Sequence, residues 1–362
     1  METKPLNRRS FLQLSALSIG GLSLSRWRRA LQAPEFPDVE RIGRVCVGKV
    51  ELKARPDEAS ESVGVLYEDA VVPWLREKVG QWPWRNNQRF VETPDGYIWS
   101  PYLQPVKNQP NKPVDSLPGT GPDRGMWVEV TIPWADGVLA NPPARSHWLD
   151  FRIENGLPPR FYYSQILWVD DLKTDESGQI LYRINERYGN PGDILWAPAE
   201  AFRPLTPSEL APINPGVEDK SIRVNVNWNE QSLSCFEGGT EVYYCRISSG
   251  VSSGSTPVTP PGGRGFPIWR KLHSVHMAGG TNADGWDLHG IGWTQLFVGE
   301  GVAIHSTFWH NNFGEPMSHG CVNASPEDAK WIFRWSQPDV SFDSGDRTIV
   351  GDGSTRVTVL ED

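Results

Sequence analysis

Hydrophobic and polar residues alternate in short runs over residues 42–106, and turn-forming residues separate the runs. Valines at positions 45–50 begin the pattern, residues 62–66 and 70–75 continue it, and residues 95–99 close it. Alternation over four to eight residues, with a turn about every ten residues, is typical of short strands in a small barrel or sandwich. We therefore predict one small β-domain over this segment.

A second strand-rich block over residues 124–205 ends like the first. Gly192–Pro198 (GDILWAP) repeats the pattern of Asp95–Pro101 (DGYIWSP). This repeat predicts a second β-rich domain that is a diverged copy of the first. Residues 107–123 and 206–219 are rich in proline and poor in apolar residues, which predicts a linker on each side of this domain.

The pattern is sharpest over residues 220–362. Apolar residues alternate with polar ones from 222 to 226, and residues 232–247 form two alternating runs around a Gly-Gly pair, which predicts a strand followed by a hairpin. Ser325 precedes a proline and two acidic residues, the pattern of a capped helix start. Residues 356–360 read as the last strand. The predicted fold class is mainly β throughout.

The amino-acid composition excludes some classes of fold and of binding partner. Of 362 residues, 38% are hydrophobic and 22% are charged, which supports ordinary cores. The chain holds 35 glycines and 31 prolines, a content that favours turn-rich β-domains over helical bundles. Its formal net charge is −9 and it has no basic run, so we expect no nucleic-acid partner, because such binding needs clustered cations.

The first 35 residues have the pattern of a targeting segment. Arg8 and Arg9 precede an uncharged apolar stretch, residues 14–24, that is too short to span a bilayer. The pair resembles a twin-arginine export signal. We therefore expect an extracytoplasmic protein exported by that route, with membrane contact only if residues 1–35 remain uncleaved as an anchor.

The chain has four cysteines, so one free catalytic thiol leaves room for at most one disulfide. Cys235 and Cys245 flank the predicted hairpin turn, and pairing about that turn places Cys235 opposite Val242. We therefore predict no disulfide between them, and we expect Cys46, Cys235 and Cys245 to be buried structural thiols.

Candidate chemistry gathers near the end of the chain, where six of the seven histidines fall between His273 and His319 and Cys321 follows. A thiol is mostly protonated at neutral pH, and an imidazole that accepts its proton produces the nucleophilic thiolate. Gly320 removes a side chain beside the sulfur, and backbone N–H groups around Gly320 and Cys321 are candidates to hold an oxyanion.

The segment IHSTFWHNNFGEPMSHGCVN, residues 304–323, resembles the active-site signature of the L,D-transpeptidases, the YkuD-like catalytic domain. TPPG at residues 259–262 resembles a loop of the same family, and the likeness runs from Lys220 to the C-terminus. It implies a catalytic domain of the L,D-transpeptidase β-sandwich or barrel type. Residues 42–106 resemble a bacterial SH3-like domain, so one or two small SH3-like barrels are expected before it.

The resemblance also implies roles for single residues. Cys321 is the acyl nucleophile, His305 its base, and the main-chain carbonyl of Ser306 the third partner. Many relatives have glycine at the position of Ser306, and the spacing from His305 to Cys321 is short for the family. The remaining expected residues are Ser318, His319 and Gly320 as support for the nucleophile, and Thr307, Trp309 and Asn323 as substrate contacts. Core packing is an alternative for Trp309, and His273, His276, His289 and His310 are expected to be structural or to lie at the rim.

The function implied by the resemblance is acyl transfer on peptidoglycan stem peptides. Cys321 forms a thioester and passes the acyl group to an amine, and a carbapenem is expected to add to the same sulfur. Transfer to water instead describes a carboxypeptidase. A wall-lytic cysteine peptidase is a further alternative, although those enzymes usually place the cysteine before the histidine. A wall-binding protein whose catalytic domain is inactive is another alternative.

A zinc site is the last alternative. Its ligands are His305, His310, His319 and Cys321. No standard metal-binding spacing supports this site, so we expect neither a metal nor a cofactor.

Overall fold

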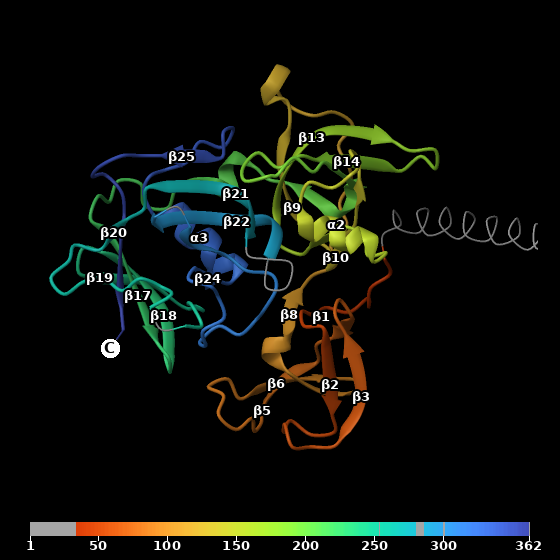
Figure 1. Ribbon diagram of the computed structural model, residues 1–362, viewed down its shortest axis with the longest axis horizontal. Coiled ribbons are helices and arrows are strands. Elements are labelled where there is room, and N and C mark those ends of the chain that lie inside the picture. Colours follow the sequence, from red (N-terminus) through yellow and green to blue (C-terminus); the bar gives the residue numbers. More distant parts are fainter. Residues whose placement is uncertain (1–33, 253, 280–285, 300, 362) are drawn as a thin grey trace, which may run out of the picture.

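The computed structural model describes residues 34–252, 254–279, 286–299 and 301–361, and these form three β-rich parts arranged around a common junction (Figure 1). Each part has its own apolar core. The predicted mainly β fold class is confirmed. The export signal is predicted in a segment whose first 33 residues lie outside the described ones. No helix among the described residues has the length and apolar character needed to cross a bilayer.

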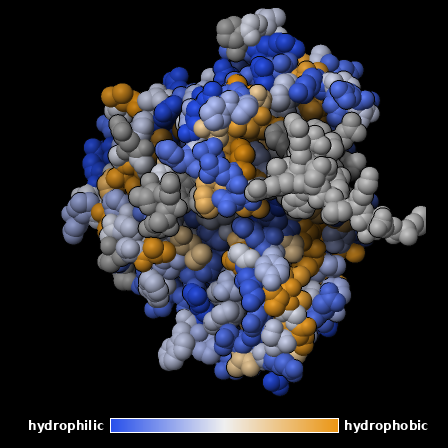
Figure 2. Space-filling model, turned by 45° about the vertical axis from the view of Figure 1, so that its right-hand side comes forward, coloured by the Kyte–Doolittle hydropathy of each residue, from blue (hydrophilic) through white to orange (hydrophobic). Residues whose placement is uncertain are grey.

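The first module, at the bottom of Figure 1, packs a three-stranded sheet against a five-stranded one. Its buried core includes Val45, Trp74, Val91, Ile98 and Leu103. In Figure 2, hydrophobic residues on the surface of this part form scattered patches among polar ones. The strands are β1 (Ile42–Val45), β2 (Lys49–Lys53), β3 (Ser62–Tyr67), β4 (Val71–Pro73), β5 (Arg76–Val79), β6 (Arg89–Thr93), β7 (Gly96–Trp99) and β8 (Leu103–Val106).

The second module repeats the closing connection of the first. In the first module β7 leads through a 3₁₀ turn to β8, which pairs with β1. In the second module β15 leads through a 3₁₀ turn to β16, which pairs with β9. The sequence repeat therefore corresponds to a repeated strand–turn–strand unit. The elements are β9 (Met126–Val130), β10 (Trp134–Asp136), β11 (Val138–Leu139), α2 (His147–Glu154), β12 (Arg160–Tyr162), β13 (Ile166–Thr174), β14 (Ile180–Ile184), β15 (Leu195–Pro198) and β16 (Phe202–Pro204).

The two predicted linkers pack against the neighbouring domains. Between the modules, the Val114 N–H donates to the Tyr182 hydroxyl at 2.7 Å, and Leu117 is buried in the core of the second module. After the second module, the Thr206 side chain caps a 3₁₀ helix (Pro207–Leu210), and Ile213 packs on the C-terminal core. Each segment therefore packs apolar side chains against a neighbouring core.

The C-terminal domain packs two sheets, each five-stranded within the described residues, face to face. Apolar residues of both sheets and of a helix, α3, share one core, which includes Ile222, Val224, Trp293, Ile304 and Trp335. The elements are β17 (Lys220–Asn227), β18 (Glu230–Glu237), β19 (Thr240–Arg246), β20 (Phe266–Pro267), β21 (Arg270–Gly279), β22 (Trp286–Val298), β23 (Val302–Ser306), β24 (Val322–Ala324), α3 (Pro326–Trp335), β25 (Asp346–Thr348) and β26 (Arg356–Leu360).

Both ends of α3 are capped by side chains. At the start, the Ser325 hydroxyl accepts the Asp328 N–H at 3.2 Å, as the sequence predicts. At the other end, the ammonium of Lys271 donates to the carbonyls of Phe333 at 2.6 Å and Ser336 at 2.7 Å. Burial lowers the pKa of Lys271 to about 7. This lysine satisfies helix-end carbonyls that have no partner within the helix.

The four cysteines are free. The predicted register at the hairpin was wrong by one residue, because Cys235 lies opposite Tyr243 rather than Val242. A register shift between Cys235 and Phe236 inserts the extra residue. Cys46, Cys235 and Cys245 are buried, and burial raises the pKa of each thiol.

Candidate active site

The predicted base lies on β23, and the predicted nucleophile lies directly before the neighbouring parallel strand β24. β23 and β24 pair with His305 opposite Asn323 and Ile304 opposite Val322. Opposite residues of neighbouring strands face the same side of a sheet, and Ile304 and Val322 face the core. The side chains of His305 and Asn323 therefore share the other face with Cys321, which lies two residues before Asn323. Residues far apart in the sequence are thus brought to one face.

His305 is a buried, neutral imidazole with a defined tautomer. Its Nδ1 lies 2.9 Å from the carbonyl oxygen of Ser306, so Nδ1 carries the proton and donates it. Burial lowers the pKa of His305 to about 4, although the Ser306 carbonyl opposes that shift. Nε2 is therefore the basic nitrogen across the neutral pH range. The Ser306 carbonyl is thus the hydrogen-bond partner that fixes the tautomer of His305 in this structure.

The Cys321 thiol is half-buried beside apolar side chains. It packs on the cluster of Leu272, Leu296 and Ala303, and its sulfur lies 3.3 Å from the carbonyl oxygen of Gly301. Burial raises the pKa of Cys321, although a hydrogen bond from the backbone of Ala303 opposes that shift. In this conformation the thiol is thus protonated and donates to Gly301 rather than to His305.

The turn before the sulfur is fixed by Ser318 and Gly320. The Ser318 hydroxyl donates to the Cys321 carbonyl at 2.6 Å and accepts the Gly320 N–H at 3.0 Å. Gly320 has a φ of 149°, and a Cβ at this position would lie 2.7 Å from the carbonyl oxygen of Ser255. Its N–H is engaged by Ser318 in this conformation, so Gly320 serves the turn geometry. His319 is exposed on the same turn.

Asn323 and His310 hold the loop that joins the two strands. The Asn323 side-chain amide lies 2.9 Å from His310 Nε2, and the Asn312 N–H donates to His310 Nδ1 at 3.2 Å. Burial lowers the pKa of His310 to about 3. Thr307 is also buried, at 1% exposure. The structure therefore places Asn323 and Thr307 among packed side chains rather than at an open surface.

The first module contacts this loop directly. Arg44 Nη2 donates to the Phe308 carbonyl at 2.6 Å. The Glu315 carboxylate accepts the Asn86 N–H at 2.8 Å and pairs with Arg85 at 3.1 Å. These contacts join residues more than two hundred positions apart, so no local sequence pattern indicates them. The first module is thus a fixed support of the catalytic loop.

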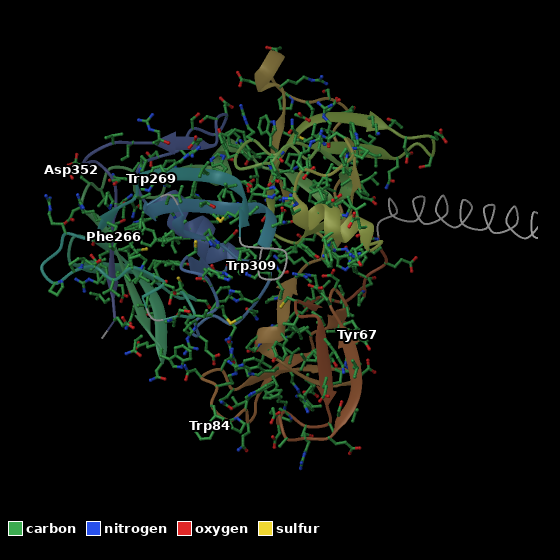
Figure 3. The ribbon with its side chains drawn as sticks, viewed as in Figure 1. Tyr67, Trp84, Phe266, Trp269, Trp309 and Asp352 are labelled. Atoms are coloured by element: carbon green, nitrogen blue, oxygen red, sulfur yellow. The ribbon has the colours of Figure 1, made fainter. Side chains whose placement is uncertain are left out.

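Trp309 lies where the three parts meet (Figure 3). Its ring is 5.8 Å from the His305 ring, and it is only half-buried. It lines a pocket together with Arg160 and Tyr162 of the second module and Glu68 of the first. The pocket is therefore built by all three parts of the chain.

The comparison of the chain with protein families decides the identity of the C-terminal domain. The sequence model of the YkuD family, described as the L,D-transpeptidase catalytic domain, matches residues 221–359. This segment is an L,D-transpeptidase catalytic domain. The match begins within one residue of the predicted boundary at Lys220, and it contains His305 and Cys321. No curated protein matches the chain significantly.

Solved structures of L,D-transpeptidases are similar to this chain. The C442S mutant of the Enterococcus faecium enzyme is 24% identical over 40% of this chain and 51% of its own, with a TM-score of 0.30. A Mycobacterium smegmatis L,D-transpeptidase is 19% identical over 50% of this chain and 90% of its own, also with a TM-score of 0.30. The E. faecium catalytic domain acylated by ertapenem is 21% identical over 40% of this chain and 98% of its own, with a TM-score of 0.29. The chain thus spans about half the length of the first of these structures.

Proposed function

We propose that this protein is an exported L,D-transpeptidase that uses Cys321 to transfer acyl groups between peptidoglycan stem peptides. The family match of residues 221–359 supports the reaction class. The observation that carries the residue assignment is the parallel pairing of β23 and β24. It puts the predicted base and the predicted nucleophile on one face, and the Ser306 carbonyl sets the tautomer of the base.

The reaction begins with a rotation of the thiol. Cys321 leaves the Gly301 carbonyl and turns toward His305, whose Nε2 takes the proton from the sulfur. The thiolate attacks the carbonyl carbon of the stem peptide, and the terminal D-amino acid leaves as its nitrogen takes the proton back from His305. The remaining acyl group stays on Cys321 as a thioester.

A second half-reaction releases the enzyme. An amine of another stem peptide loses a proton to His305 and attacks the thioester carbonyl, and the Cys321 sulfur leaves and is reprotonated. Attack by water instead of the amine gives a carboxypeptidase. Trp309 lines the pocket and its ring lies 5.8 Å from the ring of His305, so we assign the pocket to the stem peptide on that ground, although neither His305 nor Cys321 lines it.

Incubation with purified muropeptides tests the proposal. The wild type is expected to release the terminal D-amino acid and to form cross-linked dimers, which mass spectrometry identifies. Cys321→Ala is expected to form neither product while keeping the circular dichroism spectrum of the wild type. Shortened stems without dimers assign the enzyme as a carboxypeptidase, and full turnover by Cys321→Ala refutes the assignment of the nucleophile.

A carbapenem provides an independent readout of the nucleophile. Its strained lactam carbonyl is an electrophile for a thiolate, so ertapenem is expected to add once to the wild type and not to Cys321→Ala. Intact-protein mass spectrometry measures the adduct. An adduct of equal yield on Cys321→Ala contradicts the assignment.

Export through the twin-arginine route completes the proposal. Arg8 and Arg9 followed by an apolar stretch support it. A reporter fused to residues 1–35 is expected to leave the cytoplasm in a normal strain and to stay inside in a strain that lacks this route. Export in both strains refutes the route.

A further inference from the structure

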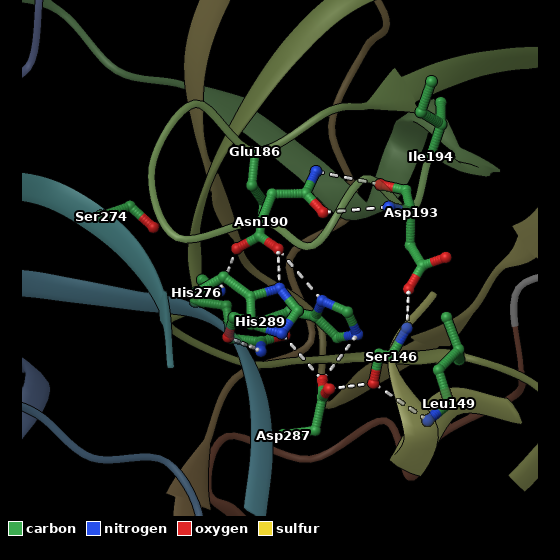
Figure 4. Close-up of polar contacts among 12 residues, drawn as sticks. Ser146, Leu149, Glu186, Asn190, Asp193, Ile194, Ser274, His276, Asp287 and His289 are labelled. Carbon is green, nitrogen blue, oxygen red and sulfur yellow. Dashed lines mark hydrogen bonds and ion pairs between the residues drawn. The ribbon is translucent and has the colours of Figure 1, made fainter. Parts of the chain in front are cut away.

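Four ionisable side chains outside the catalytic pair meet where the second module packs on the catalytic domain (Figure 4). Glu186, just after β14, places Oε2 2.8 Å from Nδ1 of His276 on β21 and 3.0 Å from Nδ1 of His289 on β22. On the other side of the rings, Asp287 Oδ1 lies 2.9 Å from His276 Nε2 and 3.9 Å from His289 Nε2. The four side chains are between 0% and 12% exposed.

Neutral donors hold both carboxylates from outside. The Gly290 N–H donates to Glu186 Oε1 at 2.6 Å, and the Ser146 hydroxyl donates to Asp287 Oδ2. Each acid therefore has one oxygen fixed by the scaffold and the other directed at the imidazole rings. Glu186 Oε2 is left facing the Nδ1 atoms of both histidines.

We propose that Glu186, His276 and His289 bind a divalent transition-metal ion such as Zn²⁺, which cross-links the second module to the catalytic domain. The three ligand atoms, Oε2 of the acid and Nδ1 of each ring, lie within 4.8 Å of one another. Tetrahedral zinc with bonds of about 2.1 Å holds its ligand atoms roughly 3.4 Å apart. The two oxygen–nitrogen contacts, at 2.8 and 3.0 Å, each open by about 0.4–0.6 Å to reach that spacing.

The surroundings have the features of a metal site rather than of a chance contact. Histidines that bind metals through one nitrogen usually donate the other N–H to a carboxylate, and Asp287 stands at that position for His276, at 2.9 Å. Its oxygen is 3.9 Å from Nε2 of His289. The two carboxylates balance the charge of a divalent ion when both rings are neutral. Two imidazoles and one carboxylate suit zinc and its neighbours better than calcium or magnesium.

The site also has an entry route. Asp287 and His289 line the pocket that contains Trp309, so an ion and a water as fourth ligand have access from that side. The sequence pattern predicted His276 and His289 to be structural or rim residues and predicted no bound metal. The zinc ligands considered from the sequence, His305, His310, His319 and Cys321, are not the residues that come together. Among the described residues, the group within metal-binding distance is Glu186, His276 and His289.

Metal analysis of the full-length protein tests the proposal. The chelator-treated protein is dialysed against Zn²⁺, and bound metal is measured by plasma mass spectrometry. About one ion per chain is expected for the wild type, for Cys321→Ser and for His147→Gln, which changes an exposed histidine. Glu186→Gln and His289→Gln are expected to lose the ion. Absence of zinc from the wild type, or its loss from Cys321→Ser with retention in Glu186→Gln, overturns the proposal.

Two measurements on proteins with an unchanged site keep the test decisive if those variants fail to fold. Co²⁺ bound to the wild type and to Cys321→Ser is expected to show tetrahedral ligand-field absorption without a thiolate charge-transfer band. Zn²⁺ is also expected to raise the unfolding temperature of Cys321→Ser, because the ion binds only the assembled interface. A charge-transfer band that disappears in Cys321→Ser, or an unfolding temperature unchanged by Zn²⁺, overturns the proposal. Because Cys321→Ser lacks the nucleophile, failure of this site is distinguishable from failure of the proposed enzyme activity.

Discussion

Replacement of His305 by glutamine is expected to slow acylation of Cys321 by a factor that depends on pH. Glutamine keeps a side-chain N–H for the Ser306 carbonyl but cannot accept a proton from the thiol. The variant therefore reacts only through thiolate that forms by ionisation in water. The wild type, by contrast, transfers the proton to His305 during the reaction.

The size of the effect follows from the two pKa values. The ordinary thiol value is 9.0 and burial raises the pKa of Cys321 above it, so less than about 1% is thiolate at pH 7. The variant is thus expected to be at least about 100-fold slower at pH 7, with the deficit shrinking about tenfold for each pH unit up to pH 9. The pKa of His305 is about 4, so its base form is present above that pH and wild-type acylation should be flat from about pH 5 to 9.

The assay is ertapenem acylation followed by intact-protein mass spectrometry across this pH range. Circular dichroism at each pH verifies the fold, and His147→Gln serves as a matched histidine control at an exposed position. A deficit in His305→Gln that stays constant with pH refutes the general-base role. A wild-type rate that falls below pH 6.5 refutes the depressed pKa of His305.

Three further changes probe the scaffold of the site. Gly320→Ala is expected to lower the free energy of unfolding in urea by about 1–3 kcal/mol, because Gly320 has a positive φ and a new Cβ would meet the Ser255 carbonyl. Gly301→Ala, at a position with open space around it, should change that free energy by no more than about 0.5 kcal/mol, and equal losses in the two variants contradict the role of Gly320 in the turn. Lys271→Met leaves two carbonyls at the end of α3 without their donor and is expected to cost about 2–4 kcal/mol in the same measurement, so an unchanged midpoint argues against the cap. Arg44→Ala breaks a buried ion pair and the contact with the loop between β23 and β24, so we expect a loss of about 3 kcal/mol in the free energy of unfolding and slower ertapenem acylation. Arg76→Ala, which breaks an exposed ion pair, should match the wild type in stability and in acylation rate. A wild-type acylation rate in Arg44→Ala shows that the contact does not support the site.

The first and second modules both contribute residues to the surroundings of the candidate site. Its Arg44, Arg85 and Asn86 bind the loop between β23 and β24, and the second module supplies Arg160 and Tyr162 to the pocket beside Trp309. Parts of the chain outside residues 221–359 therefore contact the loop of the candidate site and line the pocket beside it.

Local patterns in the sequence were sufficient for much of the architecture. Alternation identified β17 and β26, and the serine–proline pair identified the start of α3, because the period of apolar residues and the capping hydrogen bond are properties of neighbouring residues. The Ser-His-Gly-Cys element and the upstream histidine, which lie close together in the chain, indicated the family that the comparison then identified.

The tertiary structure alone decided which distant groups meet and in which protonation state. Chain folding brings Glu186 beside His276 and Arg44 beside Phe308, pairs that no spacing or periodicity connects. Burial, which depends on everything packed around a group, lowers the pKa of His305 and raises the pKa of the Cys321 thiol. A sequence specifies which side chains are present, but their solvation and their distant neighbours come from the packed chain as a whole.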